Sequence, residues 1–543
     1  MTGLVGTRRL VRLALRRDRV QLPVWLAALT ATHIVSAISV IDLYPEEAER
    51  VALARSSATS AVTLAFNGLI SGSSTGAIVA SQTLLLMALG AAFMSIFLVV
   101  RHTRQNEETG RAELIGAASV GRHAQLTAAV VTVVFANLAL GVLNAAGLIA
   151  CSLPVGGSIA MGAAIAGAGI AFGAVAAVAA QIPRTSRAAN GLASAALGVA
   201  FGLRTIGDMA SHVTEDGVKV VSGWASWLSP IGWSQQIRPY HEDQWWVLML
   251  LVAVAAACVA VAFVLAARRD LGAGMLADRP GPSHARKWLP SPLGLAWRLH
   301  RGVLLGWVIG VTVLGFGYGA VADQVDDLIG DSDATTDIIQ ELGGGTGSLT
   351  DLYLALVMGI IGLTVAGYGI AAAMRMRHEE SAGTLEAVLG TAVGRVRWVA
   401  GHVLVVAGGV LGLLALSGAA AGLAYGLAVD DALHQTARFA GVGLVQAPAA
   451  LVLVGLAVAA FGLFPRRARA IAWGVFALCL VLGQFGELFG LPGAVLDLSP
   501  FTHLPAAPTE RVTVTPLALL CAVAVAAGAV GTAAFRRRDL VTS

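Results

Sequence analysis

Two segments of the sequence carry acidic, basic and glycine residues at the same spacing. They read RQNEETGRAELIGAASVGR over residues 104–122 and RHEESAGTLEAVLGTAVGR over residues 377–395. The shared positions are Arg104, Glu107, Gly110, Glu113, Val120, Gly121 and Arg122 in the first copy and Arg377, Glu380, Gly383, Glu386, Val393, Gly394 and Arg395 in the second. Unrelated segments of this length would share roughly one or two positions, so the match indicates an internal repeat.

The chemistry that these residues predict is ionic docking. Arginines between apolar runs are explained by membrane topology, whereas glutamates contribute little to orientation. A short helix that carries Glu107 and Glu113, or Glu380 and Glu386, can dock on a basic soluble partner, because opposite charges fix its register there. The alternative is a solvated loop whose charges only prefer water. Duplication of the same charges at one spacing favours the partner site.

Long apolar runs surround these segments and must position them. The chain has 543 residues, of which 57% are hydrophobic and only 13% charged, against about 25% charged in a soluble domain. Runs of about 20 apolar residues can cross a bilayer as helices, and they are continuous rather than alternating, which excludes a barrel. We therefore predict an all-α polytopic membrane protein of about twelve spans. The expected spans are 21–41, 80–100, 125–150, 158–182, 190–208, 245–266, 303–321, 352–374, 399–428, 437–464, 470–489 and 515–534.

Arginines alternate between the connections of these spans and predict the orientation. They occur in the N-terminal segment and in every even-numbered connection, whereas the odd-numbered connections are neutral or, like 323–341, acidic. By the positive-inside rule, both termini and both repeated segments should be cytoplasmic. Arg8, Arg12 and Arg16 share a helical face opposite Leu10 and Leu13. This predicts an amphipathic helix in the membrane interface, with a simple cluster of topogenic arginines as the alternative.

Further landmarks divide the chain into two similar halves, residues 1–280 and 281–543. Leu228-Ser229-Pro230 recurs as Leu498-Ser499-Pro500, and Arg268-Arg269-Asp270-Leu271 recurs as Arg537-Arg538-Asp539-Leu540. Each half has six expected spans, so both halves enter the membrane the same way up. This predicts parallel six-helix repeats related by a pseudo-two-fold axis along the membrane normal.

The repeated segments resemble the cytoplasmic coupling segment of ABC-2 type exporter permeases. That family has an acidic residue, Gly-Thr, a second Glu, small residues, Pro-Val and a basic residue. Gly383-Thr384-Leu385-Glu386 fits best, whereas the first copy has Gly110-Arg111, and Ser119 and Ala392 stand where proline is usual. The whole chain is similar to the fused twelve-span actinobacterial form, described as exporters of polyketide or tetronasin-like antibiotics.

The resemblance implies a transport subunit rather than an enzyme. A phosphate-binding loop would end in Gly-Lys-Ser/Thr, and the two lysines, Lys219 and Lys287, have no such neighbours. ATP and Mg²⁺ should therefore be bound by a separate ATPase, in two copies that the resemblance suggests form a homodimer. The implied substrates are hydrophobic or amphipathic small molecules, and export is the implied direction. We expect no cofactor or metal in this chain, and no nucleic-acid partner.

Charged and polar residues within the fifth span of each half are candidates for an outer gate or exit path. Arg204 and Asp208 are one turn apart and can pair, and the corresponding span carries Gln484 and Glu487. Ionisable residues inside spans are costly and suggest function. The alternative is a pair that reaches the interface and water.

Other polar residues within spans predict structural contacts. His33, Asn137, Asn144 and Gln446 should hydrogen-bond between helices.

Two other classes compete with the exporter. An ion-coupled secondary transporter would also suit two six-span halves, but it predicts mid-membrane carboxylates, of which the sequence has few. A membrane-embedded enzyme would need a catalytic cluster in a large loop, and the acidic segment 323–341 contains no histidine.

Overall fold

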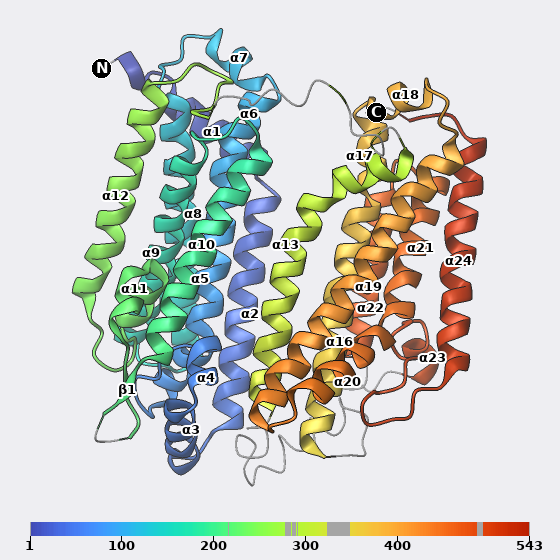
Figure 1. Cartoon of the computed structure of the whole chain (residues 1–543). Helices are drawn as coiled ribbons and strands as arrows, with labels where there is room; N and C mark the ends of the chain where they lie inside the picture. The colour runs from blue at the N-terminus through green and yellow to red at the C-terminus, as the bar shows by residue number, and fades with distance from the viewer. Residues whose placement is uncertain are drawn as a thin grey trace. The chain divides into compact units, whose positions relative to one another are not determined.

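The computed structural model describes residues 2–214, 217–276, 284, 289, 291–322, 348–485 and 492–541. The chain divides into two compact units, Met1–Pro280 and Gly281–Ser543 (Figure 1). Within the described residues, ten helices are long and apolar enough to cross a membrane. This confirms an all-α polytopic membrane protein. The ten are Gln21–Leu43, Thr75–Glu108, Ala124–Ala150, Val155–Ala179, Trp245–Ala267, Pro292–Val321, Leu349–Ser381, Arg395–Ala428, Ala432–Leu463 and Val514–Arg537.

The first unit is a helix bundle built around α5 and α9, whose residues are mostly buried. Its N-terminal helix α1 lies at the same end as α6 and α7, whereas α3 and β1 lie at the opposite end (Figure 1). β1 and β2 form a two-stranded antiparallel sheet. The elements are η1 Thr2–Leu4, α1 Thr7–Arg17, α2 Gln21–Leu43, α3 Glu47–Thr59, α4 Ala61–Phe66, α5 Thr75–His102, α6 Arg104–Glu108, α7 Arg111–Gly116, α8 Ala124–Ala150, α9 Val155–Ala179, α10 Ser186–Met209, β1 His212–Val213, β2 Val220–Val221, η2 Trp224–Leu228, α11 Pro230–Gln236 and α12 Trp245–Ala267.

The second unit follows the same order of long helices. Helices α17 and α18 lie at the end that carries the C-terminus, and α23 lies at the other (Figure 1). Pro448 lies in the first turn of α21, just after the junction with α20, where its missing N–H interrupts the regular helix within the span Ala432–Leu463. The elements are α13 Pro292–Val321, α16 Leu349–Ala373, α17 Arg375–Ser381, α18 Thr384–Leu389, α19 Arg395–Ala428, α20 Ala432–Val445, α21 Ala447–Leu463, α22 Ala468–Phe485, α23 Gly493–Leu496 and α24 Val514–Arg537.

The fifth expected span of each half differs from the others. Helix α10 covers the expected span 190–208, but it is not among the ten apolar helices of the described residues, and it carries Arg204 and Asp208. Helix α22 covers the start of the span expected at 470–489, and its apolar part, Ala468–Gly483, is shorter than the others. The acidic segment 323–341 lies outside the described residues.

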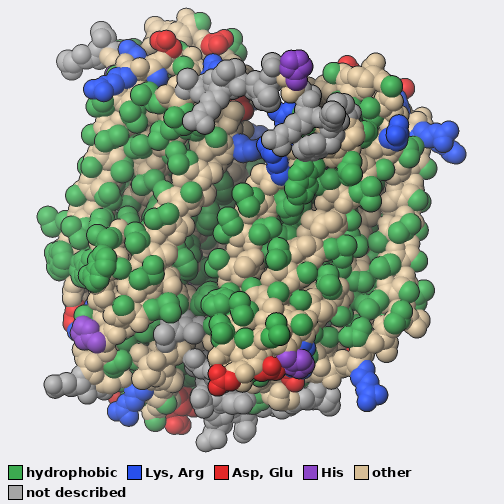
Figure 2. Space-filling model, viewed as in Figure 1, with side chains coloured by type: hydrophobic (Ala, Val, Ile, Leu, Met, Phe, Trp, Pro, Cys, Tyr) green, Lys and Arg blue, Asp and Glu red, His purple; other side chains and the backbone are tan. Residues whose placement is uncertain are grey.

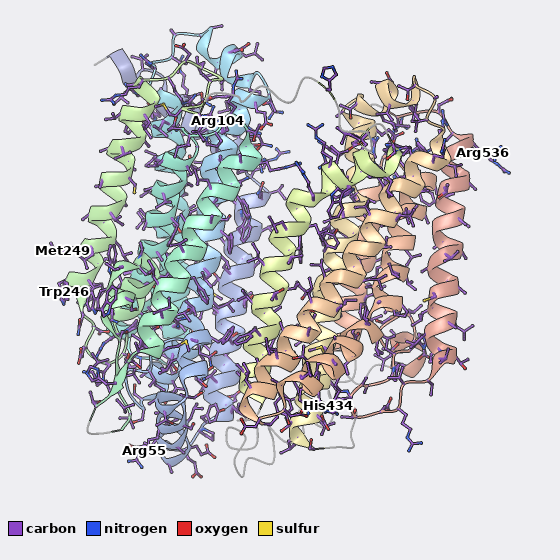
Figure 3. The ribbon with its side chains drawn as sticks, in the orientation of Figure 1. Arg55, Arg104, Trp246, Met249, His434 and Arg536 are labelled. Atoms are coloured by element: carbon purple, nitrogen blue, oxygen red, sulfur yellow. The ribbon has the colours of Figure 1, made fainter. Side chains whose placement is uncertain are left out.

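Exposed apolar side chains follow the long helices of each unit, whereas charged side chains gather near the helix ends (Figure 2). Trp246 and Met249, which are 54% and 69% exposed, point outward from α12 (Figure 3). Tryptophan favours the boundary between lipid and water. The start of α12, with Trp245 and Trp246, therefore marks one membrane interface of the first unit.

Glycine allows α21 and α24 to pack with their backbones in contact. A Cβ atom on Gly531 would lie 2.3 Å from the carbonyl oxygen of Val458, whereas a Cβ on Gly528, one turn earlier in α24, would meet nothing within 4 Å. Without a strong hydrophobic force between helices in lipid, such close approach supplies much of their attraction.

We expect Gly531→Val to destabilise the second unit by about 1–3 kcal/mol, the usual cost of overpacking. Gly528→Val introduces the same side chain into the same helix and should have a much smaller effect. The measurement is the fraction of monodisperse protein that remains after heating in detergent. Equal losses in the two variants would contradict close packing at Gly531.

Candidate coupling site

Each repeated segment folds into two short helices that meet at a glycine in the left-handed conformation. Gly110 lies between α6 and α7 with φ 71°, and Gly383 lies between α17 and α18 with φ 75°. A side chain would raise the energy of this conformation by about 1–2 kcal/mol, so the turn explains why both copies have glycine here. The sequence predicted one short helix with both glutamates of a copy, but the glycine turn separates them. Glu107 and Glu380 lie on the first short helix, α6 or α17, and Glu113 and Glu386 lie on the second, α7 or α18.

In the first unit, the first glutamate of the segment is bound within the protein. Two nitrogens of Arg269, just beyond α12, donate to the Glu107 carboxylate at 2.6 and 2.8 Å. Arg104 donates to the same carboxylate at 2.8 Å, and the backbone N–H of Gly272 donates at 3.3 Å. Arg104 is fully buried and also donates to the carbonyl of Ala180 (Figure 3). Glu107 thus ties α6 to the chain that leaves α12.

The arginine that ends the first segment binds the same part of the chain. Arg122 donates to the carbonyl of Ala267 at 2.8 Å, and to those of Ala266 and Arg269 at 3.5 and 3.4 Å. The last carbonyls of a helix lack partners within the helix, and a cation there also interacts favourably with the helix dipole. Arg122 therefore caps α12.

The second unit repeats this arrangement residue by residue. Arg538, just beyond α24, donates to Glu380 through two nitrogens, one at 2.9 Å. Arg377 donates to the carboxylate at 3.2 Å, and the N–H of Val541 donates at 2.9 Å. The Glu380 side chain is fully buried.

The cap at the end of the sixth span is repeated as well. Arg395 donates to the carbonyls of Phe535 and Arg536, at 3.1 and 3.3 Å, and to that of Arg538. These acceptors occupy the same places at the end of α24 that the acceptors of Arg122 occupy at the end of α12.

We call these sets the two clamps. The first consists of Arg104, Glu107, Arg122 and Arg269, and the second of Arg377, Glu380, Arg395 and Arg538. A carboxylate held by two arginines and a backbone N–H is a strong, directional arrangement. Each clamp fixes its segment to the end of the sixth long helix of the same unit.

The second glutamates remain exposed. Glu113 and Glu386 form no ion pair within the described residues. Only Ala112 of α7 and Leu385 of α18 are buried. Leu114, next to Glu113, is 77% exposed. The two short helices thus present their second glutamates to solvent.

Comparison with known proteins gives the family. Residues 289–536 match the family model described as the C-terminal domain of the multidrug efflux system permease Rv1217c. Over 540 residues, which are 99% of this chain and 96% of the relative, the sequence is 40% identical to the multidrug efflux system permease protein Rv1217c of Mycobacterium tuberculosis. The chain belongs to this family of multidrug efflux permeases. Membership agrees with the resemblance to ABC-2 type exporter permeases.

The structure of the permease changes the interpretation of two predicted docking residues. The sequence pattern assigned Glu107 and Glu380 to a partner surface, together with Glu113 and Glu386. Glu107 and Glu380 are instead nearly or fully buried, with side chains 7% and 0% exposed, and their charges are neutralised by arginines of the same unit. They are therefore internal contacts, and of the four glutamates only Glu113 and Glu386 are free to meet a partner.

The arginines that pair with these glutamates, Arg269 and Arg538, were not among the predicted site residues. The signal that could have found them is the repeated Arg-Arg-Asp-Leu after each sixth span. Each half of the chain contains one copy of this motif, and the second arginine of that copy binds the first glutamate of the repeated segment in the same half.

At the other end of the permease's first unit, Arg204 and Asp208 form the expected pair at 2.7 Å, with both side chains fully buried. Arg204 also donates to the carbonyl of Leu64 at 2.9 Å and to the Gln235 side chain at 3.0 Å. Asp208 accepts from the Ser222 hydroxyl at 2.9 Å. The pair therefore joins α10 to α4 and α11. The side chain of Gln484 and the whole of Glu487, which are the matching candidates of the second half, lie outside the described residues.

Polar residues within the spans of the first unit bond between helices, as expected. His33 of α2 contacts Asn144 of α8 at 2.5 Å and Thr83 of α5 at 3.1 Å. Asn137 of α8 donates to Ser95 of α5 at 2.8 Å. Both ring nitrogens of His33 are thus occupied, which fits a structural role.

Proposed function

We propose that this permease exports hydrophobic or amphipathic small molecules with energy from ATP, which a separate ATPase binds and hydrolyses. In this proposal the ATPase docks on the exposed faces of α7 and α18. The chain itself contributes no nucleotide site, and ATP and Mg²⁺ belong to the partner. Because there are two docking helices, we expect two ATPase subunits, one for each helix, arranged as a homodimer.

The observation that carries the proposal is the duplicated clamp. A docking helix can move a membrane helix only if the two are rigidly joined. In each unit the short helix follows the clamp glutamate by a few residues, and the clamp holds the end of α12 or α24. A displacement of α7 or α18 by the ATPase would therefore be transmitted to the sixth span of that unit.

The proposal places both clamps and both termini on the cytoplasmic side. We expect a cysteine at position 117, which is exposed beside α7, to resist an impermeant maleimide in intact cells. A cysteine at position 212, exposed at the opposite end of the first unit, should react. Both would be placed in a background without the four native cysteines. Reaction at 117 with protection at 212 would invert the orientation.

The competing function is ion-coupled transport, and the energy source separates the two. Cells that express the permease with its ATPase should still extrude a fluorescent hydrophobic dye after an ionophore collapses the proton gradient while ATP is maintained. Depletion of ATP with the gradient intact should stop extrusion. The opposite pattern would assign the permease to the ion-coupled class.

A further inference from the structure

A basic cavity lies beside the N-terminal helix of the first unit. It encloses about 490 Å³ between α1, the junction of α5 and α6, α7 and α8. Arg16 and Arg17 of α1 and Arg111 of α7 line it, as do apolar side chains that include Leu13 and Ile115. The cavity therefore combines cations with an apolar wall.

Among the residues that the structure describes, no carboxylate forms an ion pair with the arginines of this cavity. Arg17 donates to the neutral side chain of Asn106 at 2.6 Å. Arg16 and Arg111 have no carboxylate partner in the part of the chain that the structure describes. The neighbouring carboxylate, Asp18, is bound to Arg101 at 3.2 Å and to His102.

The electrostatics of Arg17 agree with this account. Burial lowers the pKa of its guanidinium, and repulsion by Arg111 and Arg101 lowers it further, against a smaller opposing effect of Asp18. Like charges held together in a partly buried place are unfavourable unless an anion joins them. The cavity therefore suits an anionic ligand.

The matching positions of the second unit carry fewer cations. By the spacing of the repeat, Arg111 corresponds to Thr384 and Asn106 to Glu379. The Glu379 carboxylate pairs with Arg375 at 3.2 Å. The second unit thus has a negative charge where the first unit has the neutral side chain of Asn106. The clamps and the docking helices exist in both units. Arg111, which Thr384 replaces in the second unit, therefore serves neither of these shared features.

We propose that this cavity binds an anionic phospholipid, with the phosphate between Arg16, Arg17 and Arg111 and the acyl chains against the apolar wall. Guanidinium groups bind phosphate oxygens through paired hydrogen bonds. Helix α1 is amphipathic, and Leu13 on its apolar face is 52% exposed, as suits a helix that lies in the membrane interface. Basic pockets at such an interface are suited to lipid headgroups.

The bound lipid would join α1 to α7, because its phosphate contacts arginines from both helices. The lipid would thereby support the first docking helix and would have no counterpart in the second unit. This inference goes beyond the proposed function, since lipid binding to the purified chain needs neither an ATPase nor a transported substrate.

Native mass spectrometry of the purified full-length chain tests the proposal. The detergent-solubilised protein is titrated with phosphatidylglycerol and, separately, with phosphatidylcholine of the same acyl chains. We expect one phosphatidylglycerol to bind at least tenfold more tightly than phosphatidylcholine. Arg111→Thr, which introduces the residue of the second unit, should reduce this preference at least fivefold. Arg8→Thr, on α1 but outside the cavity, should retain it.

Free phosphate provides the second arm of the experiment. Inorganic phosphate at millimolar concentration should not displace phosphatidylglycerol, because phosphate lacks the acyl chains that contact the apolar wall. Displacement by phosphate alone would show an ion site and overturn the lipid assignment. Equal binding of the two lipids, or equal behaviour of Arg111→Thr and Arg8→Thr, would also overturn it.

Discussion

Glu380→Gln should cause a large loss of both stability and coupled transport. The substitution keeps the shape of the side chain but leaves the cations of Arg377 and Arg538 without their shared counter-charge. Removal of one partner from a buried ion pair typically costs about 3–5 kcal/mol. We expect thermal stability to fall by several degrees, and drug-stimulated ATPase activity of the complex to fall at least tenfold at equal membrane expression.

The matched control for this variant is Asp539→Asn, which removes a carboxylate from the exposed residue next to Arg538. Asp539 forms no ion pair within the described residues, so the control should behave like the unmodified protein. The double variant Glu380→Gln/Arg538→Gln should be less unstable than the sum of the two single variants, with a coupling energy of about 0.5–3 kcal/mol. Additive losses would contradict a direct contact between the two side chains.

The second large effect is expected from charge reversal on the docking helices. Glu113→Arg and Glu386→Arg should each weaken ATPase association and transport, because each would place a positive charge against the basic surface that we propose for the partner. Like charges in contact cost several kcal/mol, so association should fall by at least tenfold. Insertion and thermal stability should not change, because both side chains are exposed. Glu386→Arg should be the more damaging, since its segment has the Gly-Thr of the family pattern.

Asp497→Arg supplies the control for charge reversal. It makes the same change on an exposed residue at the end of the second unit that lies away from α18. Association of the ATPase and drug-stimulated hydrolysis should be normal in this variant. If Glu113→Arg and Glu386→Arg also retained the partner and full activity, the docking assignment would be wrong.

The membrane class and the family could be predicted from the sequence because their signals are local. Apolar runs and arginine clusters are read directly along the chain, and the duplicated segments stand out through their equal spacing. The surroundings of the charged residues in the fifth span could not be predicted from the sequence. Arg204 and Asp208 lower the hydropathy of α10, and only the three-dimensional structure shows that they are enclosed by contacts from α4 and α11.

The different roles of the glutamates within one segment could not be predicted from spacing. Glu107 and Glu113 are six positions apart in the same short stretch of sequence, yet the first side chain is buried and the second is exposed. The difference depends on Arg269, which lies 162 positions from Glu107 in the sequence. A local sequence pattern cannot show that the chain folds back to bring Arg269 to Glu107. The side-chain type gives no help either, because both residues are glutamates.

The most direct test of the account is whether the ATPase contacts α7. A photoreactive benzoylphenylalanine at position 114 would replace Leu114, which is 77% exposed beside Glu113. The control position is Leu228, which is 58% exposed in η2 of the same unit. This element directly precedes α11, which lies away from α7 (Figure 1). After irradiation of membranes that contain the permease and its ATPase, we predict a crosslinked product of the two proteins from position 114 and none from position 228. A product from position 228 alone, or from neither position in an active complex, would contradict docking on this helix.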